Sequence, residues 1–170
     1  MSQINAKSAA SGDAAPLQSW RLADAAATAA LGAELAARLP SGAILLLTGD
    51  LGTGKTCLVQ GLALALGIRG PITSPSFALS QHYGGERADG SATALVHLDL
   101  YRLEDSASAD ELFAQEEEEA RALGALLAVE WPQRLTLPPA GSWCLELSLL
   151  DPTDPEAGRL GCLTPPPSEP

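Results

Sequence analysis

The sequence has few aromatic and few basic residues, and each shortage excludes something. Aromatic side chains make up only 4% of the 170 residues, so aliphatic side chains and alanine must fill the core. The 10 lysines and arginines stand against 21 acidic residues, which gives a net charge of −11. A surface of that sign repels phosphate backbones, so we expect no direct binding of this chain to duplex DNA or RNA.

Long apolar runs and paired cysteines are also missing. No run approaches the roughly 18–20 apolar residues that span a bilayer. Residues 1–17 carry no hydrophobic segment typical of a secretion signal. The three cysteines, Cys57, Cys144 and Cys162, are too dispersed for a CxxC metal pair. Together these absences favour a reduced, cytoplasmic protein without a membrane partner.

A chain of this length, with 46% apolar side chains, predicts one domain with a buried core. Residues 1–18 are mainly Ser, Ala, Gly and polar, so we expect a disordered lead-in. Six of the 13 prolines lie between residues 152 and 170, so we expect residues 151–170 to form a Pro-rich extended tail. The folded domain is therefore predicted to occupy residues 19–150.

Strand-like and helix-like patterns alternate within this domain. Leucines 31, 35 and 39 form one helical stripe after Asp24, which is a predicted N-cap. Further helices are predicted at 55–66 and 105–123, and strands at 20–22, 43–47, 76–83, 95–99, 126–130 and 143–149. This alternation predicts an α/β fold, a three-layer α/β/α domain whose mostly parallel sheet has helices on both faces.

Residues 49–56 read GDLGTGKT and match the pattern G-x-x-x-x-G-K-[ST] in full. The glycines let backbone N–H groups form an anion nest, and the following helix directs its positive end to the same point. Chance produces this pattern in a chain of this length roughly half a per cent of the time. Here an apolar strand directly precedes it, and Lys55 is the only lysine besides Lys7. We therefore predict a nucleotide site with Lys55 on the β- and γ-phosphates and Thr56 on Mg²⁺.

Two acids, Asp99 and Glu130, each close an apolar strand. In a parallel sheet such strand ends meet at one edge, where the phosphate loop must also lie. Either acid could hold Mg²⁺, while the other orients or activates the attacking water. The alternative for each acid is an N-cap or turn carboxylate.

Four neighbouring features have two interpretations each. The Trp131 indole can stack on adenine or plug the edge of the core. His97 can support Asp99 from the same strand face, or be a neutral core histidine. The hydroxyls of residues 73–76 can reach a γ-phosphate as switch loops do, or form a plain turn. The glutamates at 116–119 can be a solvated helix face or a docking surface for a basic partner.

Several classes of phosphate-loop protein are excluded. A Ras-type GTPase reads guanine with Asn-Lys-x-Asp, which needs a lysine that this chain lacks beyond Lys7 and Lys55. ABC-type ATPases need an LSGGQ-like segment, which is absent from the sequence. A P-loop ATPase, a P-loop small-molecule kinase and a nucleotide-gated binding module remain possible.

Four motifs resemble, in this order, the signature of the bacterial TsaE (YjeE) family: GDLGTGKT at 49–56, SPSF at 74–77, HLDLYR at 97–102 and VEWP at 129–132. The resemblance covers about residues 22–150. It implies a single P-loop domain that binds and slowly hydrolyses ATP with Mg²⁺, as the ATPase component of tRNA threonylcarbamoyladenosine synthesis. In that family the ATPase docks on the TsaB–TsaD heterodimer, which modifies adenosine 37, so the contact with tRNA is only indirect.

The resemblance also implies roles for single residues. The catalytic residues are expected to be Lys55, Asp99 and Glu130, the metal ligands Thr56, Glu130 and Asp99, the switch-like hydroxyls Ser74 and Ser76, and the nucleotide contacts Thr28, Gly49, Leu51, Gly52, Thr53, Gly54, Lys55, Thr56, Cys57 and Trp131. Two positions depart from the family's usual residues. Ser76 replaces Thr and keeps the hydroxyl, and Cys57 replaces Thr or Ser.

Overall fold

The computed structural model describes residues 18–167, whose helices and strands alternate as the sequence predicts. The helices are α1 (Ala25–Arg38), α2 (Lys55–Ala65) and α3 (Ser106–Leu123), with 3-10 turns at Pro132–Arg134 and Pro155–Ala157. The strands are β1 (Gln18–Leu22), β2 (Ile44–Thr48), β3 (Ser80–Glu86), β4 (Ala92–Asp99), β5 (Leu126–Glu130), β6 (Trp143–Leu149) and β7 (Arg159–Thr164). The predicted lead-in lies outside the described residues, except for Gln18, which begins β1.

The seven strands of the described part form one sheet in the order β1-β7-β6-β2-β5-β4-β3. The four central strands, β6, β2, β5 and β4, are parallel. At one end β3 pairs antiparallel with β4, and at the other end β7 and β1 continue the sheet with antiparallel pairings. The predicted parallel sheet is therefore confirmed at its centre, and both outer parts are antiparallel.

The strand expected at 76–83 begins later than predicted. β3 starts at Ser80 and forms a hairpin with β4. Before it the chain turns, because Leu79 has a φ of 66° and its N–H donates to the carbonyl oxygen of Pro75. A residue in the left-handed region cannot continue a strand ladder. Residues 73–76 are consequently a loop, which lies beside the end of β4.

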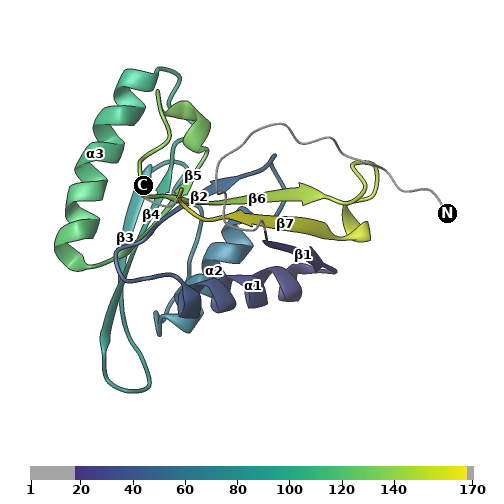
Figure 1. The fold of residues 1–170 in the computed structure, drawn as a ribbon, viewed down its shortest axis with the longest axis horizontal. Coiled ribbons are helices and arrows are strands. Elements are labelled where there is room, and N and C mark those ends of the chain that lie inside the picture. Colours follow the sequence, from purple (N-terminus) through teal and green to yellow (C-terminus); the bar gives the residue numbers. More distant parts are fainter. Residues whose placement is uncertain (1–17, 168–170) are drawn as a thin grey trace.

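Helices cover both faces of the sheet, with α1 and α2 on one side and α3 on the other (Figure 1). Side chains of β4 alternate accordingly, with Leu95 in the core under α1 and α2 and Leu98 in the core under α3. Gly61 lets α1 and α2 pack closely, since a Cβ there would lie 1.9 Å from the carbonyl oxygen of Ala29. The expected three-layer fold is confirmed. Within residues 18–167, no helix combines the length and hydrophobicity that crossing a membrane needs.

Local sequence signals set the helix ends. The Asp24 carboxylate accepts the N–H of Ala27 at 2.8 Å and caps α1, as predicted. Asp105 caps α3 by accepting the N–H of Ser108 at 2.8 Å. Gly124 ends the same helix with a φ of 60°, the left-handed conformation in which glycine is favoured. The chain then enters β5 two residues later.

The expectation of an extended tail over residues 151–170 is wrong for the residues described there. β7 lies inside the sheet between β6 and β1, and its Leu163 is only 2% exposed. The prolines flank this strand, since Pro155 begins a 3-10 turn before it and residues 165–167 follow it. Proline outside a strand removes no ladder hydrogen bond. The folded unit therefore extends beyond residue 150 and includes β7.

The glutamate run at 116–119 is solvated only in part. Glu116 is 7% exposed, and its carboxylate is hydrogen bonded to Nε2 of His82, which joins α3 to β3. Glu117 pairs with Arg121 on the same helix at 3.0 Å. The expectation of a solvated face is therefore wrong for Glu116, which belongs to the packing between α3 and the sheet.

Candidate functional site

The phosphate-loop sequence lies at the carboxyl end of the parallel strands. Residues 49–54 follow β2, and α2 begins at Lys55. β4 and β5 end in Asp99 and Glu130, which are paired in the strand register. On the other side of β5, Leu47 of β2 pairs with Glu130. The sheet thus brings both predicted acids to the loop.

Three glycines set the shape of this loop. Gly49, Gly52 and Gly54 have φ angles of 143°, 80° and 101°, a region in which a side chain is strained. Gly49 also lacks room, since a Cβ there would lie 2.4 Å from the carbonyl oxygen of Leu147. Gly54 is the N-cap of α2, and the first N–H groups of a helix have no partner within it and attract anions. The backbone is therefore suited to bind a phosphate group.

Lys55 is the cationic group of the loop and is only 5% exposed. Its Nζ donates to the carbonyl oxygens of Gly49 and Asp50, the latter at 2.9 Å. Burial lowers the pKa of the Lys55 ammonium, while nearby carboxylates, Glu130 foremost, oppose that shift. A bound anion would meet a partly desolvated cation, and charges attract more strongly where water is excluded.

Glu130 is held between side chains from two other elements. Its Oε1 accepts a hydrogen bond from Nε2 of His97 at 2.8 Å, and Oγ1 of Thr56 lies 3.5 Å from the same oxygen. The imidazole is fully buried and Glu130 is 3% exposed. Of the two interpretations of His97, support of Asp99 is wrong, because the imidazole bonds to the acid on the neighbouring strand, whereas its full burial agrees with a core histidine.

Asp99 has a different set of partners. Its Oδ2 accepts hydrogen bonds from the hydroxyls of Ser74 at 2.9 Å and Ser76 at 3.0 Å. Its Oδ1 accepts the backbone N–H of Tyr101 at 3.0 Å. Asp99 thus ties the loop at 73–76 to the end of β4. The hydroxyls that the sequence predicts as switch-like lie at the site, bonded to one of its acids.

Trp131 lines the site from the end of β5. It has φ 59° and ψ 48°, which is unusual for a bulky residue. Its ring centre lies 4.6 Å from Nζ of Lys55 and 4.8 Å from the ring centre of Tyr101. The indole also packs against the core under α3. It therefore packs on the edge of the core, as one of its two interpretations predicts, and it also lies beside the lysine of the loop.

These groups line one cavity of about 340 Å³. The predicted site residues that line it are Leu51, Gly52, Gly54, Lys55, Thr56, Cys57, Ser74, Ser76, Asp99, Glu130 and Trp131. Gly49, Thr28 and Thr53 are not among the residues that line it. Thr53 donates its hydroxyl to the carbonyl oxygen of Asp50 at 2.8 Å, and Thr28 donates to that of Asp24 at 3.0 Å. Gly49 and Thr53 therefore shape the loop from within it, whereas the hydroxyl of Thr28 is engaged inside α1.

Two residues at the site are not among the predicted ones. Tyr101 lines the cavity, and it could have been found because it stands two residues after a predicted strand-end acid. Arg159, the first residue of β7, donates Nη2 to the carbonyl oxygen of Gly52 at 3.3 Å. The proline-rich surroundings concealed Arg159. The short apolar run over residues 160–163 that follows it is the strand signal that could have revealed it.

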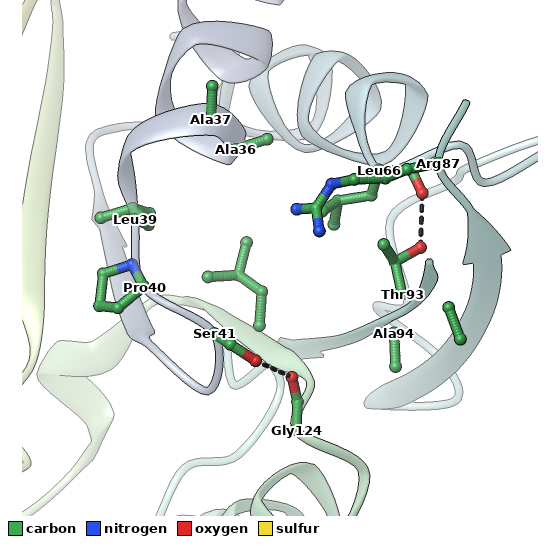
Figure 2. A pocket seen from close by; sticks show the side chains of 12 residues that line it. Ala36, Ala37, Leu39, Pro40, Ser41, Leu66, Arg87, Thr93, Ala94 and Gly124 are labelled. Atoms are coloured by element: carbon green, nitrogen blue, oxygen red, sulfur yellow. Dashed lines mark hydrogen bonds between the residues drawn. The ribbon is translucent and has the colours of Figure 1, made fainter. Parts of the chain in front are cut away.

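A second cavity, of about 360 Å³, lies at the opposite end of the parallel strands (Figure 2). Arg87 is the one charged residue among its described lining, which is otherwise mostly alanine, leucine and backbone. Both hydroxyls that line it are already engaged. Ser41 donates to the carbonyl oxygen of Gly124 at 3.0 Å, and Thr93 donates to that of Leu66. The chemistry-bearing groups are therefore concentrated in the phosphate-loop cavity.

The phosphate-loop cavity offers oxygen ligands for a metal ion. Among the residues described, no three His, Cys, Asp or Glu side chains gather as a metal cluster. Mg²⁺ needs no such cluster, since it keeps several waters and takes one or two carboxylates together with phosphate oxygens. The hydroxyl of Thr56 and the carboxylate of Glu130 supply oxygen donors 3.5 Å apart. The residues present thus fit Mg²⁺ bound together with a phosphate group.

Known proteins resemble this chain over most of its length. The family model described as "Threonylcarbamoyl adenosine biosynthesis protein TsaE" matches residues 22–154. The tRNA threonylcarbamoyladenosine biosynthesis protein TsaE of Synechocystis sp. is 47% identical over 116 residues, which are 67% of this chain and 69% of that protein. The protein of the same name from Nostoc sp. is 40% identical over 119 residues, 70% of each chain.

A solved structure agrees with these sequence matches. The crystal structure of YdiB from Bacillus subtilis superimposes with a TM-score of 0.65 at 27% sequence identity, and covers 88% of this chain and 86% of its own. The family match includes the phosphate loop, the serine loop and both strand-end acids, which are the residues that the cavity brings together. The chain therefore belongs to the TsaE family, which is named for its part in threonylcarbamoyladenosine biosynthesis.

Proposed function

We propose that this chain binds ATP with Mg²⁺ in the phosphate-loop cavity and hydrolyses it, as the ATPase component of the tRNA N6-threonylcarbamoyladenosine machinery. One observation carries the proposal: the glycine loop, its buried lysine and two strand-end acids line the same cavity. Positioning and charge stabilisation are what phosphoryl transfer requires of a protein. Family membership supports the choice of pathway.

The groups at the loop are assigned to the phosphates and the metal. We assign the phosphates to the loop N–H groups and to Lys55, whose Nζ now donates hydrogen bonds to two neutral carbonyl oxygens and can exchange them for an anion. We assign Mg²⁺ to Thr56 and Glu130, directly or through water. When bound, the ion would neutralise negative charge on the phosphate oxygens.

Trp131 is assigned by its distance from Lys55, and the two serines by their hydrogen bonds to Asp99. Trp131 lies 4.6 Å from Nζ, so we assign its indole to the phosphate end of the nucleotide rather than to the adenine ring. Asp99 holds Ser74 and Ser76 beside the loop, which places two more hydroxyls at that end. We propose that this loop responds to the γ-phosphate as switch loops do.

The proposal includes dependence on partner proteins. We propose that the chain acts with the TsaB–TsaD heterodimer and meets tRNA only through that complex, because a net charge of −11 disfavours direct contact with a polyanion. We also propose a cytoplasmic setting. The cysteines Cys57, Cys144 and Cys162 are free thiols, which suits a reducing compartment.

Steady-state ATP hydrolysis with Mg²⁺, measured alone and with purified TsaB–TsaD, tests the proposal. We expect slow turnover by the chain alone and faster turnover with the partners. Lys55→Ala is expected to lower the stimulated rate by about 100-fold or more, because it removes a cation aimed at the transferred phosphate. Lys7→Ala is the matched control, since Lys7 is the only other lysine and lies outside the loop.

Three results would contradict the proposal. Turnover that is indifferent to TsaB–TsaD would remove the partner-dependent ATPase. An increase in turnover caused by a small metabolite instead of the proteins would favour the P-loop kinase. Equal activity of Lys55→Ala and Lys7→Ala would show that the phosphate loop is not where ATP reacts.

A further inference from the structure

The chain contains two histidines, and each is hydrogen bonded to one glutamate in a different part of the fold. His82 and Glu116 join β3 to α3. In the second pair, Glu130 lines the phosphate-loop cavity and its Oε1 lies 2.8 Å from Nε2 of His97, which is not part of that lining. The His97 side chain has no solvent exposure and that of Glu130 has 5%. His97 thus makes a buried contact with the side chain of a proposed metal ligand.

The strand register explains why His97 reaches Glu130. His97 on β4 is paired with Ala128 on β5, and Glu130 lies two residues further along β5. Residues two apart on a strand share one face of the sheet. Ala128 carries only a methyl group and is fully buried, so the imidazole can extend along β5 toward the carboxylate. Two strands and one small residue are needed to build this contact.

The contact fixes one oxygen of the carboxylate. A carboxylate only accepts hydrogen bonds, so Nε2 of His97 carries the shared proton. The hydrogen bonds of the described residues engage Oε1 of Glu130 alone, the same oxygen that lies 3.5 Å from Oγ1 of Thr56. The terminal torsion of a glutamate is otherwise broad. The buried ring removes that freedom and sets which oxygen faces Thr56.

We infer that His97 is a positioning residue that holds Glu130 in the orientation in which it binds Mg²⁺ beside Thr56. This inference rests on the proposed function. Nδ1 of His97 is buried and has no partner among the described residues, so Glu130 is the one polar group that the imidazole contacts there. The histidine acts through the glutamate, since its ring makes no hydrogen bond to the loop or to Lys55 within the described part of the chain. Hydrogen bonds behind metal ligands commonly change metal affinity by about 10–100-fold.

Two substitutions separate positioning from packing. His97→Gln carries an N–H donor at about the place of the imidazole Nε2, whereas His97→Asn carries its donor one bond shorter and cannot reach Oε1. Both are polar amides in the same buried place. His82→Asn is the matched control, since it breaks the other histidine–glutamate contact away from the cavity.

The readout is the affinity for a fluorescent ADP analogue, titrated with Mg²⁺ and again with a chelator. We expect the wild type to bind the analogue more tightly with Mg²⁺ than without it. In His97→Asn this increase in affinity is expected to be about tenfold smaller, while the Mg²⁺-free affinity is unchanged. His97→Gln is expected to restore most of the gain, and His82→Asn to match the wild type. Circular dichroism at the titration temperature ensures that native folds are compared.

The inference and the proposed function fail in distinguishable ways. A wild type that binds the analogue in neither condition overturns the proposed function, and the inference with it. A wild type that responds to Mg²⁺ while His97→Asn responds equally overturns the inference alone. The same holds if His97→Gln and His97→Asn lose the gain to the same extent, because the position of the donor would then have no effect.

Discussion

Asp99 and Glu130 occupy equivalent positions in the sheet, but the hydrogen-bond partner of Glu130 lies in the sheet and those of Asp99 lie in loops. They are paired in register at the ends of β4 and β5, and both are almost fully buried. Glu130 bonds to a buried side chain of the sheet itself, whereas Asp99 bonds to hydroxyls and a backbone N–H of adjoining loops. The sheet fixes one acid, and the other acid fixes a loop. Equivalent strand ends therefore do not imply equivalent roles.

Glu130→Gln is expected to have the largest effect. The amide keeps the volume of the side chain but removes the charge that Mg²⁺ requires. We expect partner-stimulated ATP turnover, measured as phosphate release, to fall by about 100-fold or more. Affinity for nucleotide without Mg²⁺ should change little. Glu116→Gln, which alters the other buried histidine partner, serves as the control, and an equal loss there would mean that the fold and not the site was damaged.

Asp99→Asn is expected to have a smaller effect of a different kind. Hydrogen bonds to a charged acceptor contribute about 1.5–3 kcal/mol, so weakening them corresponds to about a tenfold loss of turnover. The amide N–H groups of residues 73–79 should exchange faster with deuterium, measured by mass spectrometry. The double variant Ser74→Ala, Ser76→Ala should reproduce that faster exchange, whereas Glu130→Gln should not. Faster exchange in Glu130→Gln as well would remove the distinction between the two acids.

The smallest expected effect is on the pKa of Lys55, which compares the influence of the two acids on the same lysine. Burial lowers this pKa below its usual value, and Glu130 opposes the shift more than Asp99 does. We therefore expect the pKa of Lys55, followed by NMR of its labelled Nζ, to fall from wild type to Asp99→Asn and further to Glu130→Gln. Because the folded pKa is the lower one, the unfolded chain binds more protons between the two values, and wild-type stability rises with pH across that window. A lower pKa of Lys55 in Asp99→Asn than in Glu130→Gln would contradict the stronger influence of Glu130 on the lysine.

The parts of the site that the sequence predicts are those encoded in contiguous residues. The loop at 49–56 carries its own glycines and lysine, and an acid at the end of an apolar run marks a strand end without further information. Once the strands are parallel, Asp99 and Glu130 must reach the loop's edge of the sheet. Local patterns therefore suffice for the loop, both acids and the α/β fold.

The parts that the sequence does not predict depend on which strands lie side by side. The partner of His97 is set by the register of β4 on β5, so the acid two residues along its own strand is the wrong choice. β7 is concealed because prolines lie on both sides of it, although it pairs with the preceding strand β6 as well as with β1. Arg159 is missed together with the strand that carries it.

The place of β7 also determines the order in which the sheet can be completed during synthesis. β1 pairs with β7 and with no other strand of the described sheet, so it is synthesised before the other six strands and can pair only after the last of them. Until residues 159–164 emerge, β1 and the outer side of β6 are both unpaired, and open edges of this kind pair readily with other chains. Arg159 arrives with the same strand, so its contact with Gly52 in the phosphate loop forms in the same late event. A nascent chain stopped at residue 150 would carry the loop and both acids on a sheet that still lacks β7 and its pairing with β1.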